Sequence, residues 1–436
     1  MPSTSHKCQF ALLLMSVIVG AACQPLQPPV ETSSSAPAAG AARSPAAGQA
    51  QPAGAVDTGS RTRTASAPPG APAPTWQPGT ARDPDAPVAL LLPLSGRQQS
   101  AGMAVRDGFI AAHLGSVRSR QQVLVYDVAR LGVSEAYAQA QLAGAGIIVG
   151  PLLRESVQAL NQIAGVTPVL ALNYLPDGES ARAGFWQFGL APEDETWEIA
   201  ARAVSLGQLR AISLAPDNSW GRRMQAAFQD SFAALGGQVV AARLYPPGES
   251  DFSPELRAAL AYQDKSATFA GGRRQDIDLV FLAATSTTGK LIWPQLRFYG
   301  AGNLPTYSTS AIWEDGDSNA NDLNGISFPD GPWMIAPDSR SALLKSQVAR
   351  YWGPQSLGLS RLYALGYDAW QLLPTIGRQT MAGPFRDGEL RGVTGTLNAD
   401  SMGRIHRRLQ WATVRGGQPT PALLPASDIQ PVFADP

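Results

Sequence analysis

Short apolar runs alternate with longer stretches of helical periodicity, and this alternation constrains the fold of the 436-residue chain more than any other feature. The run at 88–92 ends at a proline, which is typical of a strand buried on both faces of a parallel sheet. Similar runs recur in two successive sets, each with helical segments between them. Two sets of βαβ units predict two parallel sheets with helices on both faces, an α/β fold.

The expected elements fall into two sets and a closing section. The first set has strands at 88–92, 122–127, 147–149 and 168–171, and helices at 101–114 and 134–142. The second has strands at 210–214, 239–245, 278–282 and 305–308. Its helices are at 195–206, 253–262 and 290–298, and a further helix begins at Ser219. The closing section has helices at 339–352 and 361–378 and a strand pair at 393–397 and 405–411.

The first residues have the pattern of a bacterial export signal. A weakly basic start precedes an apolar run at 10–19, which is too short for a resident membrane helix but fits a signal-peptide core. Small residues before Cys23 resemble the lipobox of bacterial lipoproteins, in which that cysteine is lipidated. We therefore expect 1–22 to be a signal peptide, with cleavage of an ordinary secreted protein near Ala22 as the alternative. By the same resemblance, Gln24 favours the outer membrane.

Residues 23–85 are dominated by Pro, Ala, Gly, Ser and Thr. Such a segment cannot bury enough apolar surface to offset its ordering entropy, so we expect a disordered tether. As a flexible coil, roughly 60 residues have an r.m.s. span of about 40–50 Å. The tether suggests a domain that works at a distance from its membrane, although a passive spacer is the alternative.

Composition excludes several classes of function. The two cysteines are Cys8 and Cys23, so the region beyond them has no thiol for catalysis, metal binding or a disulfide. Lys and Arg (34) equal Asp and Glu (34) without a dense basic stripe, which argues against a nucleic-acid partner. The histidines, His6, His113 and His406, are scattered, and we expect the last two at the surface. With no nucleophile elbow or phosphate-binding loop, the sequence predicts no catalytic residue, metal or cofactor.

Three successive carboxylates, Glu193, Asp194 and Glu195, stand at the start of a predicted helix. Negative charge there favours the helix dipole and the first-turn amides. We prefer that role to general acid–base chemistry.

Three motifs resemble those of type I periplasmic binding proteins, which include the branched-chain amino-acid receptors of ABC transporters. They are LLPLSG at 91–96, GPLLRES at 150–156, and GVTGTLN at 392–398 followed by Gly403-Arg404. The resemblance implies two lobes, each a mostly parallel sheet flanked by helices, joined by three crossovers around a ligand cleft.

We expect the two-lobed domain to occupy residues 86–436. The expected boundaries are 86–188 and 335–385 for lobe one, 189–334 and 386–415 for lobe two, and 416–436 for an extended Pro-rich tail.

The same resemblance implies a set of cleft residues. By position they are Ser95, Gly150, Ser156 and Asn173 from lobe one, and Asp217 and Trp220 from lobe two. Asp217 begins a segment similar to the receptors' D-x-x-Y-G, with Trp220 in place of the tyrosine. The alternative is that Ser156 and Ser219 cap helices and that Trp220 belongs to the core.

A second series of motifs is similar to the C-terminal domain of the penicillin-binding protein activators, the LppC/LpoA-type lipoproteins. It comprises RRQDID at 273–278, PQLRF at 294–298, LPTYSTS at 304–310, DLNGISF at 322–328 and GPWM at 331–334. The resemblance covers nearly all of 86–415, and larger family members carry a helical-repeat domain where this chain has its tether. It implies an outer-membrane lipoprotein of a Gram-negative bacterium, on the periplasmic face, that binds a class A penicillin-binding protein and raises its peptidoglycan cross-linking.

Aromatic residues mixed with turn formers between 307 and 333 predict an ordered, partly exposed loop near the lobe junction. Tryptophan and tyrosine are favoured interface anchors. The candidate partner surface comprises Tyr307, Trp313, Asp322, Asn324, Phe328 and Trp333. Packing of the same side chains onto their own lobe is an equal alternative.

Three functions stay open on the sequence. The first is the activation of a peptidoglycan synthase. The second is a solute-binding lipoprotein of an amino-acid-type ABC transporter, with an amino-acid-like ligand in the cleft. The third is a lipid-anchored scaffold of another purpose.

Overall fold

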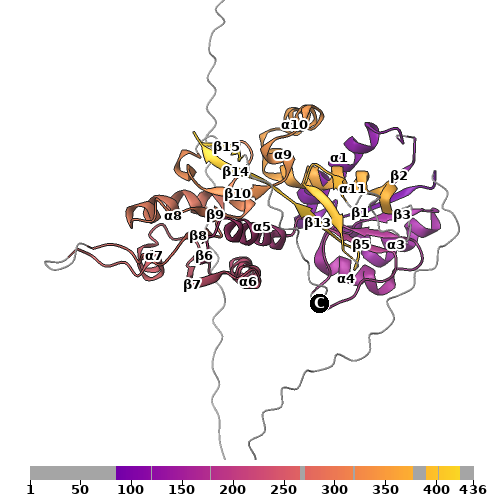
Figure 1. Cartoon of the computed structure of the whole chain (residues 1–436). Helices are drawn as coiled ribbons and strands as arrows, with labels where there is room; N and C mark the ends of the chain where they lie inside the picture. The colour runs from indigo at the N-terminus through magenta and orange to yellow at the C-terminus, as the bar shows by residue number, and fades with distance from the viewer. Residues whose placement is uncertain are drawn as a thin grey trace, which may run out of the picture. The chain divides into compact units, whose positions relative to one another are not determined.

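The computed structural model describes residues 85–422 except 119, 177, 266–270, 318–319, 377–388 and 401 (Figure 1). Cys23, the predicted signal peptide, the predicted tether up to residue 84 and residues 423–436 lie outside this part. The described residues all lie within one compact unit, Ala71–Pro436. Within the described ranges, no helix has the length and apolar character needed to cross a bilayer.

The first sheet contains eight strands, most of them parallel. In chain order they are β1 (Val88–Leu92), β2 (Val123–Asp127), β3 (Ile147–Val149), β4 (Val169–Ala171), β5 (Phe185–Phe188), β11 (Leu390–Arg391), β12 (Thr396–Ala399) and β13 (Arg404–Arg408). Their spatial order is β11-β12-β13-β5-β4-β3-β1-β2, and only the β11–β12 and β12–β13 pairs are antiparallel.

Both faces of the first sheet are covered by helices. This agrees with the sequence of β1, which is apolar at every position and so must be buried on both sides. Leu90 and Leu92 join one core cluster and Leu91 joins another, as the two-residue period of a strand requires. The helices on the first face are α1 (Gln99–Leu114) and α11 (Ser360–Ile376), and those on the second include α3 (Val133–Leu142) and α4 (Arg154–Ile163). A Cβ on Gly108 would lie 2.0 Å from the Tyr363 carbonyl oxygen, so glycine permits the close approach of α1 to α11.

The second sheet contains seven strands with the same plan. They are β6 (Arg210–Pro216), β7 (Gln238–Tyr245), β8 (Leu279–Leu282), β9 (Thr306–Ser308), β10 (Ser327–Asp330), β14 (Gln410–Arg415) and β15 (Gln418–Pro421), in the spatial order β15-β14-β10-β9-β8-β6-β7. One face is covered by α5 (Pro192–Ser205) and α6 (Ser219–Ala234), and the other by α7 (Ser253–Leu260) and α8 (Ser286–Phe298).

Further elements complete the described part. They are α2 (Val128–Leu131), α9 (Pro332–Ile335), α10 (Ser339–Trp352), η1 (Gly96–Gln98), η2 (Ser310–Ile312), η3 (Asn321–Leu323) and η4 (Pro354–Leu359).

The chain passes between the two sheets three times, after β5, after β10 and after β13. Every strand expected in the two βαβ sets is present, within a few residues of its expected bounds. The α/β fold with two mostly parallel sheets and three crossovers is therefore confirmed. The elements α4, β5 and β10 were not predicted from the sequence, and β10 contains a proline, which is rare inside strands.

The expected assignment of 386–415 to lobe two is wrong for most of that range. β11, β12 and β13 extend the first sheet, and only β14 pairs in the second. The apolar alternation at 405–411 suggested one strand, but the ribbon changes sheet at Leu409. Before it, β13 runs parallel to β5, and after it, β14 runs antiparallel to β10.

The expected tail at 416–436 begins with a strand instead. β15 pairs antiparallel with β14 across the two-residue turn Gly416-Gly417. Both glycines have positive φ, 56° and 70°, which is the backbone that tight hairpins require.

Candidate functional site

Two expected cleft residues of lobe one, Ser95 and Asn173, use their polar side chains within the lobe. Ser95 hydrogen-bonds to Asp127, which also accepts the Leu94 N–H at 2.9 Å. The Asn173 amide donates to the Leu152 carbonyl at 2.9 Å, and its oxygen accepts the Tyr174 N–H.

Gly150 and Ser156 also have structural roles. Gly150 has a φ of 97°, and a Cβ there would lie 2.1 Å from the Leu91 carbonyl oxygen. Ser156 lies inside α4, whose N-cap is Leu153, so Ser156 is not a cap residue.

The expected cleft residues of lobe two lie at the start of α6. Asp217 is exposed and forms an ion pair with Arg222. The cap of α6 is Asn218, whose side chain accepts the Gly221 N–H at 2.8 Å, so the alternative role of Ser219 as the cap is wrong. Trp220 is half-buried against the core between the second sheet and its helices.

Four of the six candidate partner-surface residues are buried, so their assignment to a surface is wrong. They are Tyr307, Trp313, Phe328 and Trp333. Tyr307, for example, packs edge-on against Trp411 and donates its hydroxyl to Gln208 at 3.0 Å. Their large apolar area is better covered by the core than exposed. Asp322 is exposed and Asn324 is half-buried.

The two histidines expected at the surface are also more buried than predicted. His113 is buried and packs edge-on against Trp370 at 4.6 Å. Burial, followed by the nearby Arg118 charge, lowers the pKa of His113. His406 of β13 is half-buried between the carboxylates of Asp194 and Asp400.

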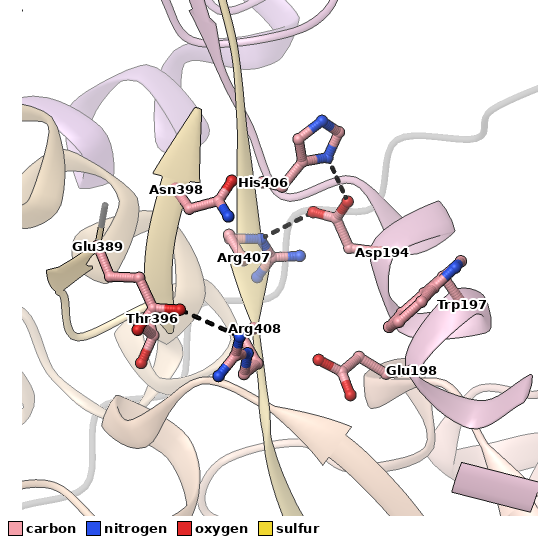
Figure 2. Close-up of a pocket in the computed structure, with 9 residues that line it drawn as sticks. All are labelled: Asp194, Trp197, Glu198, Glu389, Thr396, Asn398, His406, Arg407 and Arg408. Carbon is pink, nitrogen blue, oxygen red and sulfur yellow. Dashed lines mark hydrogen bonds and ion pairs between the residues drawn. The ribbon is translucent and has the colours of Figure 1, made fainter. Parts of the chain in front are cut away.

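A network of buried charge joins the elements at which the chain crosses between the sheets. We call Asp194, Glu195, Asp330, Arg361, His406 and Arg407 the junction network. Figure 2 shows its first part, where β13 lies beside the start of α5. His406 Nδ1 is 3.4 Å and Arg407 Nε is 3.6 Å from the two oxygens of Asp194.

His406 is held as a cation. Its Nε2 lies 3.1 Å from Asp400, so carboxylates flank both ring nitrogens. Burial lowers the pKa of His406, but the hydrogen bonds to Asp194 and Asp400 outweigh it and raise the pKa to about 9.

Two carboxyl groups of α5 have raised pKa values. Burial raises the pKa of Glu195 to about 7 against the opposing charge of Arg407, and burial raises that of Glu198 to about 7 against the Leu409 N–H. Raised carboxyl pKa values also occur in catalytic sites. Here, however, both oxygens of Glu195 are used by Ser310, which donates its N–H at 2.7 Å and its hydroxyl at 2.8 Å.

Arg361 connects the two sets of elements most directly. It extends from α11, which packs on the first sheet, to Asp330 at the end of β10, at 2.6 Å. It also donates to the carbonyl oxygens of Ser310 at 2.8 Å and Trp313 at 3.0 Å. Nearby, Lys345 of α10 pairs with Asp315 at 2.8 Å, so a second cation bridges the same two sets of elements.

The GVTG part of the sequence motif has a structural role beside this network. Asp368 of α11 is buried and accepts the N–H groups of Val393 at 2.9 Å and Thr394 at 2.7 Å. A Cβ on Gly392 would lie 2.4 Å from its carboxylate. Burial raises the pKa of Asp368, opposed by these hydrogen bonds.

One cavity adjoins the junction network, and a second lies beside Trp313 and Lys345. The first, of about 20 Å³, has room for a single water, and it is lined by Asp194, Trp197, Glu198, Glu389, Thr396, Asn398, His406, Arg407 and Arg408 (Figure 2). The other, of about 370 Å³, is lined by Trp313, Asp315, Gly316, Asp317, Met334, Ile335, Lys345, Gln418 and Pro419. Its carboxylates Asp315 and Asp317 are already paired with lysines. Neither cavity is lined by an expected cleft residue.

Asp194 and Glu195 lie in the first turn of a helix, as predicted from the sequence, but their contacts were not predicted. Asp194 and His406 are 212 positions apart. Over the described ranges, no group of three or more His, Cys, Asp or Glu is placed to hold a metal.

Comparisons with known proteins agree with this architecture. The model of the LppC lipoprotein family matches residues 82–417. The penicillin-binding protein activator LpoA of Vibrio cholerae is 26% identical over 349 residues, 74% of this chain and 56% of the relative. The chain therefore spans little more than half of that relative's length.

Solved structures show the same fold. The C-domain of LpoA from Haemophilus influenzae, described as a regulator of PBP1A, superposes with a TM-score of 0.63 at 26% identity, over 78% of this chain and all of that domain. A branched-chain amino acid ABC transporter protein from Chromobacterium violaceum superposes with a TM-score of 0.57 at 24% identity, over 76% of this chain and all of that protein, which shows the fold alone. The family match spans well over half of the sequence, and the chain belongs to the LppC lipoprotein family.

Proposed function

We propose that this protein is a non-catalytic, lipid-anchored regulator that binds a class A penicillin-binding protein and raises its peptidoglycan-synthesising activity. The observation that carries the proposal is the match to the whole length of a domain described as a regulator of PBP1A. The curated relatives are named as penicillin-binding protein activators, which supports the same partner.

The interior of the molecule supports regulation by contact rather than capture of a solute. Ser95, Asn173 and Asp217, at three of the expected cleft positions, use their polar side chains on their own lobe. In a receptor, the bound ligand pairs with such groups instead. A polar group that stays buried without a partner costs about 1–3 kcal/mol. Arg361 and Lys345 also bridge elements of the two sheets, which opposes hinge closure.

The location forms part of the proposal. Lipidation of Cys23 after removal of 1–22 would place the domain at the periplasmic face of the outer membrane. The segment up to residue 84 would then act as the tether through which the domain reaches the synthase in the cell-wall layer.

The test uses a purified class A synthase from the same organism. Its glycan polymerisation and peptide cross-linking would be measured with and without the compact unit 71–436. We expect both binding and a reproducible rise in cross-linking. No binding and no rise would contradict the proposal.

Variants of one surface residue refine that assay. Asp322 is the exposed member of the candidate partner surface, so Asp322→Lys tests whether that segment docks. Asp230→Lys on the exposed side of α6 is a matched control for the same charge reversal. A fall in activation with Asp322→Lys alone would locate the surface, and equal activation with both would exclude it.

A melting-temperature screen separates the solute-binding alternative. A ligand at 100 times its dissociation constant adds about 2.7 kcal/mol to the free energy of unfolding. We expect no such stabilisation of 71–436 by amino acids or cell-wall peptides.

A further inference from the structure

Exposed aliphatic side chains gather at one edge of the first sheet. Five of the eleven large apolar side chains that stand exposed in the described part lie on the connections into β2, β3 and β4: Leu114, Val117, Leu142, Ile163 and Val166. The three most exposed of the eleven are Val117 at 103%, Val166 at 100% and Leu142 at 89%. Single exposed aliphatics are ordinary, but a set on one edge marks an interaction surface.

Hydrogen bonds show that these connections are neighbours. The Gln121 amide donates to the Ala86 carbonyl at 2.8 Å, and the Gly146 N–H donates to the Pro87 carbonyl at 2.8 Å. Further along the edge, the Ile148 N–H donates to the Pro168 carbonyl at 3.0 Å. The amino ends of parallel strands lie at the same edge of a sheet, so these connections, which come from helices on both faces, meet at one end of the sheet. We call this end the amino-edge face.

Arginines accompany the aliphatics on this face. Arg118 and Arg120 follow Val117; Arg120 is exposed, whereas Arg118 is half-buried with its guanidinium 4.8 Å from the Trp370 ring centroid. Arg182 is exposed and donates to the Ala164 carbonyl at 2.9 Å in the next connection. Among the described residues, the carboxylates on the same connections are Asp85 and Glu179, and Glu179 is hydrogen-bonded to Gln158. Aliphatic side chains beside guanidinium groups fit the boundary between the headgroups and acyl chains of an anionic bilayer.

The chain also joins the domain at this face. β1 begins at Val88, between the connections to β2 and β3 in the sheet order, and residues 85–87 lie on the amino edge. The predicted membrane tether therefore arrives on the amino-edge face and not on the opposite edge of the sheet.

We propose that the amino-edge face binds reversibly to the surface of an anionic phospholipid bilayer, inserting Val117, Leu142 and Val166. This inference rests on the lipid anchor of the proposed function. It gives the domain a membrane-bound position besides the extended one. Insertion of a few aliphatics is weak by itself, but a tether raises their effective concentration at the membrane.

Single engineered cysteines provide the test, because 71–436 contains no cysteine. Val117→Cys and Leu142→Cys would each be labelled with an environment-sensitive fluorophore. Phe298→Cys on α8 is the matched control, since Phe298 is 78% exposed and lies on the second sheet's side. An N-terminal polyhistidine tag would hold each protein on vesicles of 65% phosphatidylcholine, 30% phosphatidylglycerol and 5% nickel-chelating lipid.

The expected result is a blue-shifted, brighter emission from positions 117 and 142 on vesicles, with position 298 unchanged. Adding Val166→Asp should lower the membrane-inserted population about tenfold, because a charge replaces an inserted aliphatic. Water-like emission at 117 and 142, or an equal shift at 298, would overturn the proposal.

The same labelled proteins separate a membrane from a protein partner. A shift at 117 and 142 on adding soluble class A synthase without vesicles, and none with vesicles, would assign the face to the synthase instead. Since the vesicle assay contains no synthase, its failure would leave the activation assay unaffected, and the reverse also holds.

Discussion

The interiors of the two sheets and the junction between them are held together by different physical means. The interiors are apolar and closely packed, as where Phe228 stacks on Phe281 with ring centroids 4.2 Å apart. The junction is held by ion pairs and charged hydrogen bonds, such as that of Arg361 to Asp330. Apolar packing tolerates many partners of similar size, whereas a buried charge requires its own partner in place. The comparison suggests that burial supplies the stability of each half, while the charges specify how the halves are joined.

The largest effect should come from removing the bridging cation. Arg361→Met leaves Asp330 buried without its partner, and we expect the free energy of unfolding to fall by about 3–5 kcal/mol. Chemical denaturation of 71–436 would measure it. Arg222→Met, which breaks an exposed ion pair, is the control and should cost less than about 1 kcal/mol. Equal costs for the two variants would contradict the role given to the junction.

A cavity in one sheet should cost somewhat less and depend little on pH. Leu282 is fully buried in β8, so Leu282→Ala should lower the free energy of unfolding by about 3 kcal/mol. The loss should be the same at pH 5.5 and pH 8.5, because no charge is removed. A cost that changes strongly between these pH values would show that the interior is coupled to the junction.

The junction should instead make stability depend on pH. The folded pKa of Glu195, about 7, lies above its ordinary value of 4.5. Below pH 4.5 both the folded and unfolded states hold the proton, so folding is unaffected. Between pH 4.5 and about 7 the unfolded state loses the proton more easily than the folded state, so stability falls, and above about 7 this loss is complete. His406 acts in the same direction, because its stabilising charge is lost as pH rises through about 9.

Glu195→Gln removes part of this dependence. We expect the variant to be about 2 kcal/mol more stable than the parent at pH 8.5 and nearly equal to it at pH 5, where the parent is protonated. Denaturation at the two pH values would measure the difference. Leu282→Ala is the control for a pH-independent change. A variant less stable than the parent at pH 8.5 would show that Glu195 is held ionised.

The smallest effect should come from an expected cleft residue. Asp217→Asn breaks an exposed pair and should change the free energy of unfolding by less than about 1 kcal/mol. It should also leave synthase activation unchanged, because the residue serves neither the core nor the junction. A loss of activation with normal stability would return Asp217 to the functional surface.

The sequence was sufficient to predict the sheets, because a buried parallel strand such as β1 must be apolar throughout. It was insufficient where the sheet to which a strand belongs depends on its pairing partner. Residues 404–415 look like one strand, and only contact with β5 and then β10 assigns their halves to different sheets.

The candidate site was less predictable than the fold. Tyr307 and Phe328 have side chains that suit an interface or a core equally, and hydropathy does not distinguish these environments. The contact of Asp194 with His406 depends on two crossovers far apart in the chain, so no local pattern indicates it.

The most direct test of the account is the distance between the two halves in solution. Ser134→Cys on α3 and Ala226→Cys on α6 would carry spin labels, at exposed positions in a unit that has no other cysteine. Pulsed electron spin resonance would give their distance distribution alone, with a mixture of amino acids, and with the synthase. If the junction network fixes the two halves, we expect one narrow distribution that amino acids do not shift and that persists when the synthase binds. A shortening of several ångströms on adding amino acids would contradict it, since that is the closure of a solute receptor.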